Sequence, residues 1–495
     1  MGWLKAKKSP MHLLKVLLFS TISGLMANAY GQTQSLYNYQ DLSHLYYQKQ
    51  KDSLKKAWVC PVVFKDDKAA QKQYKEFWDS RTESIISSIN ENDYIHDREV
   101  YNYLAGIVQQ IASANPQYVP ANQLLLIDRS SAANAYSLGD NVLIVNLGMI
   151  TFARCREDLA LTIAHELSHN YLRHFETAIQ EKAAWLTSEE YRQSMNSVLS
   201  SRYDRLTRLQ KILEGYTFSR SRHQRYHESD ADSLAIILLK KSSISFNADF
   251  FLHLDSSDNE YLQHLRQPLA AYFTPYQLTF DDSWATKRSH GLSTRAYNFS
   301  ETSAIEDSLK THPDCPERYA RTRDRSSAYP RMTPIPSSVK EKANKMLIWE
   351  LFTSSKVTPV IYRILLEKDK GNKDPWYDFM LGNCFYSLYY ADRQLNRFGA
   401  IGIVQKEFIS RDCYALQTFL EQVPRDNLRQ YCETLSKAAF WNSLSTPEQG
   451  LKDLLYTLAL DPDDSDHNKT RAAHTFATGN AGSMYCEFAD NFEKK

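Results

Sequence analysis

The sequence predicts a mostly helical α+β protein with one small antiparallel sheet and an α-helical C-terminal region. Three observations support this fold class. Glycine is scarce, with 15 residues in 495, and tyrosine is frequent, with 31, which fits amphipathic helices better than a turn-rich β sandwich. Short apolar runs of strand type cluster between residues 124 and 145. Much of the remaining chain places apolar residues at helical spacing.

Length and charge narrow the classes of protein to consider. At 495 residues the chain exceeds one ordinary domain, and two to four domains are expected. Its 59 basic and 58 acidic residues give a formal net charge of +1. This balance provides no general positive field, so we expect no nucleic-acid partner.

The first 31 residues have the pattern of a secretory signal peptide. Lysines precede an apolar run over residues 16–26, and residues 27–29, Ala-Asn-Ala, form a small-x-small cleavage site. We expect cleavage after Ala29 or Gly31 and an exported protein, periplasmic or otherwise extracytoplasmic. The apolar run is shorter than the roughly 20 residues of a membrane span, and no other segment qualifies, so no transmembrane span is expected after cleavage. An uncleaved N-terminal anchor is the alternative.

Cysteine usage is compatible with export. The chain has seven cysteines, an odd number that excludes complete internal pairing, and no C-x-x-C pair suggests a thiolate metal site. Four of them follow residue 380, where an oxidising compartment would allow one or two disulfides. The sequence does not define their connectivity.

The first part of the mature chain is expected to be helical. Residues 32–94 are polar and rich in tyrosine, lysine and glutamine, and we expect them to form an N-terminal helical segment outside a main domain over residues 95–325. Residues 97–112 place apolar side chains at helical spacing, which predicts an amphipathic helix. A long charged helical stretch over residues 176–215 has the pattern of an insertion.

Three strands are expected after the amphipathic helix. Residues 124–127 are a short run of buried type, and residues 134–138 and 142–145 are two further strand-type segments. Residues 139–141, Gly-Asp-Asn, supply the turn between the last two. The sequence therefore predicts a small antiparallel sheet just before the next helix.

That helix, over residues 159–170, carries the H-E-x-x-H signature. His165 and His169 are four residues apart and share a helix face, so two ring nitrogens can reach one ion at the roughly 2 Å that zinc requires. Glu166 lies beside them, where it can reach a metal-activated water and act as the general base. A surface helix that holds these residues by chance is the alternative.

A catalytic zinc site needs a third protein ligand and one open position. Glu228 is the best candidate, because it lies in a separate patterned segment that continues into an apolar helix. Asp232, one turn further on, could hydrogen-bond the far nitrogen of a ligand histidine. An ordinary acidic helix start is the alternative.

Three other histidines are possible ligands. His223 and His227 are also four residues apart, but they lack an intervening glutamate, and we expect them to be solvated. His174, five residues after the second histidine of the signature, is expected either to support a ligand histidine or to lie on the surface.

The C-terminal part is expected to be a separate helical domain. Residues 326–339 contain three prolines among serines and are predicted to be a linker. Residues 340–495 are helical in pattern. Because no clean 34-residue period is present, a helical-repeat array in this region is a hypothesis only.

The ordered motifs resemble the gluzincin metallopeptidase family that includes the CAAX prenyl endopeptidases and the periplasmic β-barrel-assembly-enhancing protease. The resemblance rests on His-Glu-Leu-Ser-His at residues 165–169 and Glu-Ser-Asp-Ala-Asp at residues 228–232. Residues 134–136 are similar to the family's Asn-Ala-Phe edge strand, and residues 311–318 to its His-Pro loop. The similarity covers about residues 95–325. One departure is the 58 residues between the first two motifs, which leave the shape of the cleft wall open.

The resemblance implies a zincin-like metalloprotease fold with one zinc ion. Its ligands would be His165, His169 and Glu228. Glu166 would activate the water, and Asp232 would orient a ligand histidine.

The other two motifs imply further site residues. His312 and Arg318 would lie over the cleft as catalytic residues, one able to approach the metal or the developing oxyanion and the other to hold the loop or the substrate. A loop histidine without a chemical role is the alternative for His312. The strand residues Asn134, Ala135 and Tyr136 would bind an extended substrate backbone by strand addition, and an ordinary structural edge strand is the alternative.

We therefore expect an exported zinc endopeptidase that acts on unfolded or extended proteins in envelope quality control. The helical C-terminal region would contact substrates or an envelope protein complex. The alternative is a metal-containing binding or assembly factor that acts through this helical region. An integral-membrane prenyl-protein protease is not expected, because the spans are missing.

Overall fold

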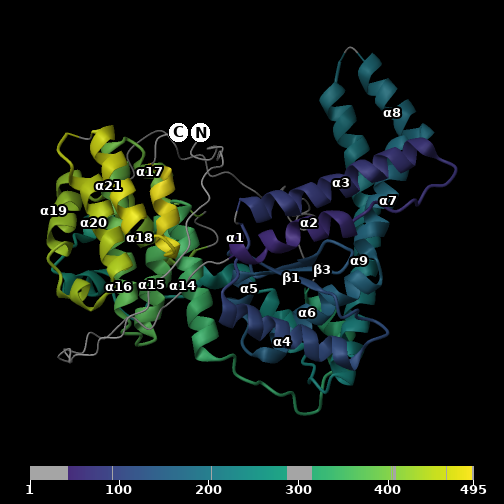
Figure 1. Cartoon of the computed structure of the whole chain (residues 1–495), viewed down its shortest axis with the longest axis horizontal. Coiled ribbons are helices and arrows are strands. Elements are labelled where there is room, and N and C mark those ends of the chain that lie inside the picture. The colour runs from purple at the N-terminus through teal and green to yellow at the C-terminus, as the bar shows by residue number, and fades with distance from the viewer. Residues whose placement is uncertain are drawn as a thin grey trace, which may run out of the picture.

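A computed structural model describes residues 43–286 and 315–492, apart from residues 92, 202, 403, 405–408 and 464. Helices dominate, and the described residues contain one three-stranded sheet. Figure 1 shows the sheet and helices α1 to α9 in one part of the molecule and helices α14 to α21 beside it. The predicted fold class, mostly helical α+β, is confirmed.

The three strands are β1 (Leu124–Asp128), β2 (Ala135–Ser137) and β3 (Val142–Asn146), in the order β1-β3-β2. β2 and β3 form the expected antiparallel hairpin. β1 instead pairs parallel with β3, so the prediction of a wholly antiparallel sheet was wrong for this strand. The physical reason is the connection. The chain passes from β1 to the far side of β3, forms edge strand β2 there, and returns as β3 in the direction of β1.

Both faces of the sheet are covered. Leu126, Val142 and Ile144 pack against apolar residues of the N-terminal helices α1 (Ser43–Tyr46), α2 (Gln48–Ala57) and α3 (Lys68–Asn90) and of the segments that follow α2 and α3. The alternate residues of the same strands, such as Leu125 and Leu143, pack with helices α4 (Arg98–Ala114) and α6 (Arg156–Tyr171). The near-continuous apolar runs in the strands follow from this two-sided burial.

The helices that follow the sheet form the framework of the site. They are α5 (Leu147–Phe152), α6, α7 (His174–Thr187), α8 (Glu189–Ser200) and α9 (Arg205–Lys241). α6 is largely buried and packs along α9, while α7 packs on α3. The helical stretch expected over residues 176–215 is therefore α7, α8 and the first part of α9.

A series of short helices then leads towards the C-terminal region. They are α10 (Asp249–Leu254), η1 (Ser257–Leu262), α11 (Leu269–Phe273), η2 (Thr274–Tyr276), η3 (Asp282–Ala285), α13 (Cys315–Thr322) and η5 (Arg323–Arg325). α13 packs against α10 and α9. Phe273 and Phe280 instead contact Phe419 of the C-terminal helices, so this segment connects the two parts through an aromatic cluster.

The C-terminal region is an assembly of helices around α16. Its members are α14 (Ser337–Thr353), α15 (Val357–Asp369), α16 (Pro375–Arg393), α17 (Arg397–Ile401), α18 (Arg411–Gln422), α19 (Arg425–Leu435), η7 (Ala439–Ser443), α20 (Thr446–Leu460), α21 (Asp466–Gly479) and η8 (Met484–Asn491). α16 packs against α15, α19 and α20, and α14 packs on α4 and α5. Among the described residues, no helix is both long enough and apolar enough to cross a bilayer. All seven cysteines lie among the described residues, and none of them forms a disulfide there.

Candidate metal centre

Helices α6 and α9 bring the signature residues together. α6 has acidic residues in its first turn, which favours helix formation there, and it is buried over most of its length. His165 and Glu166 are buried, and His169 is half-buried at the C-terminal end of the same helix. Glu228 comes from α9, 63 residues after His165 in the chain.

Three side-chain atoms converge in this place. His165 Nε2 lies 3.0 Å from His169 Nε2 and 3.1 Å from Glu228 Oε2. His169 Nε2 lies 3.5 Å from Glu228 Oε1. Four tetrahedral ligands held at about 2.0–2.1 Å from an ion stand roughly 3.3–3.4 Å from one another. The three atoms therefore have the spacing of ligands to one small cation.

The chemistry of the donors supports the same conclusion. His165 Nδ1 lies 2.9 Å from Asp232 Oδ1, so in the neutral ring the Nδ1–H donates to this carboxylate and Nε2 keeps its lone pair. That lone pair faces the Nε2 atom of His169. Two such acceptors and a carboxylate repel one another unless a proton or a cation lies between them. The residues present thus fit a bound metal ion.

Glu166 lies next to these ligand atoms. Its ligand atom and those of His165 and His169 are all within 4.8 Å of one another. Burial raises the pKa of Glu166 to about 8, while the neighbouring His165 and the backbone amide of Ser137 act in the opposite direction. A carboxylate with such a pKa is suited to taking up a proton near neutral pH.

Asp232 and Arg318 form a buried ion pair behind His165. Arg318 donates from Nε to Asp232 Oδ2 over 2.9 Å and from Nη2 to Oδ1 over 2.6 Å, and its guanidinium lies over the ring of Phe251. Burial alone would raise the pKa of Asp232, but Arg318 and His165 together lower it to about 2. Asp232 is therefore ionised and can hold the ring of His165 in one orientation.

The position of Arg318 differs from the expected one. We expected it over the cleft, whereas the structure places it behind a ligand histidine, because α13 packs against α9 and α10 and directs this side chain inwards. Its role would be to fix Asp232 rather than to contact a substrate. His312, the other residue expected over the cleft, lies outside the described residues.

His174 takes the corresponding place behind His169. The two Nδ1 atoms are 2.8 Å apart, and the His174 ring stacks on His227 with a centroid distance of 4.1 Å. Burial and the neighbouring His227 lower the pKa of His174 to about 4, so its neutral ring can accept the Nδ1–H of His169. His227, which we expected to be solvated, is half-buried by this stack. The side chain of His223 is not described.

The backbone explains how His174 reaches this position. α6 ends at Tyr171, and Arg173 has a φ of 57°, in the left-handed region. This turn reverses the chain within three residues, so that α7 begins at His174 beside the end of α6. The sequence left the role of His174 open. Its spacing from His169 was the only signal, because the turn that produces the contact needs a backbone conformation no motif specified.

Comparison with known families adds an independent observation. Residues 98–326 match the profile described as Peptidase family M48. This segment is therefore similar to the M48 metallopeptidases and is called the M48 domain. No curated protein matches the chain. The M48 match agrees with the gluzincin resemblance, whereas kinship with the CAAX or the β-barrel-assembly-enhancing subfamily stays a prediction.

The edge strand of the M48 domain lies beside α6. The backbone O of Asn134 and N of Leu138 bond to β3, so Ala135 and Ser137 direct their backbone groups to the opposite, unpaired edge of the described sheet. The Tyr136 side chain packs with the apolar cluster under α3. Of the three residues predicted to bind substrate, Ala135 thus presents backbone groups at this edge, while the Asn134 side chain accepts from the Ala135 amide over 2.9 Å.

Two glycines set the shape of the hairpin in the M48 domain. Gly139 has a φ of 73°, and a Cβ there would stand 2.9 Å from the ring of Phe175. A Cβ on Gly148 would stand 2.1 Å from the backbone oxygen of Ser131. Arg81 of α3 donates to the backbone oxygens of Leu138 and Gly139 over 2.9 Å each. The edge strand is therefore held in place from both ends.

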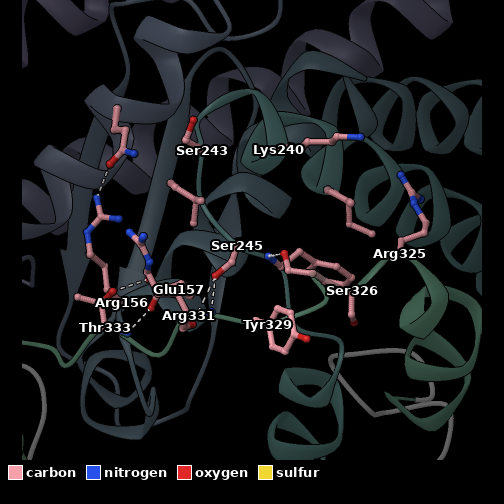
Figure 2. A pocket seen from close by; sticks show the side chains of 15 residues that line it. Arg156, Glu157, Lys240, Ser243, Ser245, Arg325, Ser326, Tyr329, Arg331 and Thr333 are labelled. Carbon is pink, nitrogen blue, oxygen red and sulfur yellow. Dashed lines mark hydrogen bonds between the residues drawn. The ribbon is translucent and has the colours of Figure 1, made fainter.

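A polar cavity lies at the other end of α6 (Figure 2). Its volume is about 660 Å³, and no metal-centre residue lines it. The segment expected to be a linker closes it: Thr333 donates to Glu157 through its amide and its hydroxyl over 2.7 Å each, and the Arg331 amide donates to Ser245 Oγ over 2.8 Å. This segment is thus bonded to the M48 domain rather than free, which the sequence did not indicate.

Proposed function

We propose that the protein is an exported zinc endopeptidase that hydrolyses peptide bonds in unfolded or extended envelope proteins. One observation carries the proposal. Ligand atoms of His165, His169 and Glu228, contributed by two helices, lie 3.0–3.5 Å apart with a carboxylic acid beside them. Two imidazoles, one carboxylate and an open position form a ligand set that catalytic zinc sites use.

Each residue of the centre has a distinct task in this reaction. When bound, zinc supplies Lewis-acid chemistry, which polarises a carbonyl and makes water more acidic. Glu166 accepts a proton from the attacking water and delivers it to the leaving amine, so the proton lost by the water ends on the amine product. Burial favours this shuttle, because it raises the pKa of Glu166 and so makes its carboxylate a stronger base.

Two groups behind the ligands keep their orientation. Asp232, fixed by Arg318, accepts from His165, and His174 accepts from His169. Because each ligand ring is held through its far nitrogen, little reorganisation is needed when the ion and the substrate bind.

The substrate class follows from the edge strand. The backbone groups of Ala135 and Ser137 lie at the outer edge of β2, where their amides donate to the Asn134 side chain and to Glu166, and this edge suits an extended chain that replaces those bonds and adds as a further strand beside α6. Backbone pairing of this kind requires an unfolded segment and makes few demands on side chains. This selectivity supports a role in the removal of misfolded proteins, for which the helical C-terminal region would provide contacts to substrates or to an envelope complex.

Export rests on the N-terminal pattern. Sequencing the N-terminus of the protein isolated from cells should give a chain that begins at Tyr30 or Gln32. A chain that still begins at Met1 would contradict the proposed export route.

Activity is tested with the full mature chain and a reduced, alkylated protein as an unfolded substrate. Wild type should cleave it, a chelator should stop cleavage, and added zinc should restore it. Glu166→Gln should lower kcat on the order of 10²–10⁴-fold or more while zinc content stays unchanged. Glu317→Gln, which replaces a half-exposed glutamate of α13 that pairs with Arg321, serves as the matched control.

The same variant separates the two functions considered. Loss of both cleavage and cellular function in Glu166→Gln would support the endopeptidase. Survival of cellular function without cleavage would favour the binding or assembly factor that acts through the C-terminal helices.

A further inference from the structure

Helix α8 and the start of α9 form a hairpin that projects from the body of the protein. Figure 1 shows the pair extending beyond α3 and α7, with the turn between them at the far end. α8 packs against α7 and α9. Within α8, all of which is described, Val198 is the single buried residue. The hairpin thus contributes little to the core of the M48 domain.

Large apolar side chains gather at the turn of this hairpin. Leu199 is 62% exposed, Tyr203 is 73% exposed and Leu206 is 82% exposed. The three fall within eight residues of sequence, at the end of α8 and the start of α9. Single exposed apolar residues are ordinary, but a group at a projecting tip marks an interaction site.

The same tip is basic. Residues 197–208 contain three arginines and one aspartate, a net charge of +2, whereas the whole chain of 495 residues has a net charge of +1. Arg205 donates to the backbone oxygens of Ser201 and Leu199 over 2.7 and 3.0 Å, and Arg208 to Ser197 Oγ over 3.4 Å. These bonds close the turn, yet both arginines are exposed and their charge faces solvent.

We propose that this tip, defined by Leu199, Tyr203 and Leu206 with the surrounding arginines, attaches the protein to an anionic lipid surface. Aliphatic side chains can enter the boundary between headgroups and acyl chains, a tyrosine is suited to the headgroup level, and arginines attract anionic lipids.

The shape of the tip favours lipid over a protein partner. It is convex and only two helices wide, roughly 20 Å, whereas a stable protein interface buries about 800 Å² on each side. A narrow apolar point with cationic side chains beside it can be immersed in a bilayer surface without a complementary cavity. The inference is independent of the proposed peptidase activity, because no metal-centre residue takes part.

The test is co-sedimentation of the full chain with vesicles. Wild type should bind phosphatidylcholine vesicles that contain about 30 mol% phosphatidylglycerol, bind pure phosphatidylcholine weakly, and release in about 0.5 M NaCl. The double variant Leu199→Ser and Leu206→Ser should bind the anionic vesicles about tenfold more weakly. Arg208→Gln should weaken binding and reduce its salt dependence, while Arg205, whose bonds to the turn are shorter, is left in place.

A matched control removes exposed apolar residues elsewhere. Leu395→Ser with Phe398→Ser, at positions 88% and 65% exposed in the C-terminal region, should bind as wild type does. Failure of wild type to bind anionic vesicles, or equal binding by the tip variants, would overturn the proposal. Tip-dependent self-association without vesicle binding would also overturn it, in favour of a second copy of the chain as the partner. Circular dichroism of each variant confirms that the fold is retained.

Discussion

Buried charged residues are arranged differently in the M48 domain and in the C-terminal region. In the M48 domain one group of them converges on a single point, where two imidazoles and a carboxylate turn their ligand atoms towards each other. In the C-terminal region they form separate groups between neighbouring helices. Lys345 of α14 pairs with Asp374 before α16, and Asp392 at the end of α16 pairs with Arg397 and Arg425.

The converging charged residues can bind an ion, whereas the charged residues of the C-terminal region pair neighbouring helices. Each C-terminal group is balanced by opposite charges already present, such as Glu341 at 3.1 Å from Lys345 in addition to Asp374. The acceptors that converge in the M48 domain lack this balance among themselves unless a proton or a cation lies between them. The two regions should therefore respond in opposite ways to substitution, one in metal affinity and the other in stability.

The largest expected effect is the removal of a ligand. Glu228→Ala leaves two protein ligands of three, so zinc affinity should fall on the order of 10³-fold or more, while the metal-free protein keeps its thermal stability. Competition with a chromophoric chelator measures the affinity. Glu317→Gln is the control and should bind zinc normally. An unchanged zinc affinity in Glu228→Ala would contradict the role of Glu228 as a ligand, on which the comparison of the two regions depends.

A C-terminal substitution should show the converse. Lys345→Met leaves Asp374 without its main partner in a buried place, which is expected to lower the free energy of unfolding by about 3–5 kcal/mol. Zinc affinity should not change. Denaturant unfolding measures the first quantity and chelator competition the second, with the exposed Lys370→Met as the control. Loss of zinc together with stability would show that the two regions are coupled.

An intermediate effect is expected from the residue behind His169. His174→Ala removes the acceptor that orients this ligand, so zinc affinity should fall about 10–100-fold, and His174→Gln should restore part of it through its amide oxygen. His253→Ala removes another half-buried, ring-stacked histidine and should leave the affinity unchanged. If His174→Ala binds zinc as wild type does, the contact is only a packing feature.

The smallest expected effect is a pH dependence of the metal-free protein. The pKa of Asp232 is lowered to about 2 in the folded protein from an ordinary value of 3.8. A lowered folded-state pKa stabilises the protein above pH 4, and this stabilisation is lost as the pH falls from 4 through 2. The difference in unfolding free energy between wild type and Asp232→Asn should therefore be full at pH 5 and shrink towards pH 2. A difference that grows on acidification would contradict the assigned pairing.

Much of the metal centre could be predicted because its geometry is local. The spacing of His165 and His169 fixes their separation on any α-helix, and Asp232 follows Glu228 by one turn. The long-range contacts were harder. The parallel pairing of β1 with β3 depends on the path of the chain around the sheet. The inward direction of the Arg318 side chain depends on how α13 packs.

The stack of His174 on His227 shows the same limit. The stack requires a left-handed backbone conformation at residue 173 and the close packing of α6 along α9. The spacing of the histidines in the sequence defines neither of these features. The fold class, by contrast, could be predicted from composition and from the spacing of apolar residues, because this spacing shows which side chains are buried.

The central claim is that one ion is held between α6 and α9 with a position left for water. X-ray absorption at the zinc edge, combined with metal analysis of the full mature chain, tests it most directly. We predict one zinc per chain, with two imidazole nitrogens and one or two oxygens at about 2.0–2.1 Å and no sulfur, and loss of the protein oxygen in Glu228→Ala. Sulfur ligands, or a zinc environment unchanged in Glu228→Ala, would contradict the account.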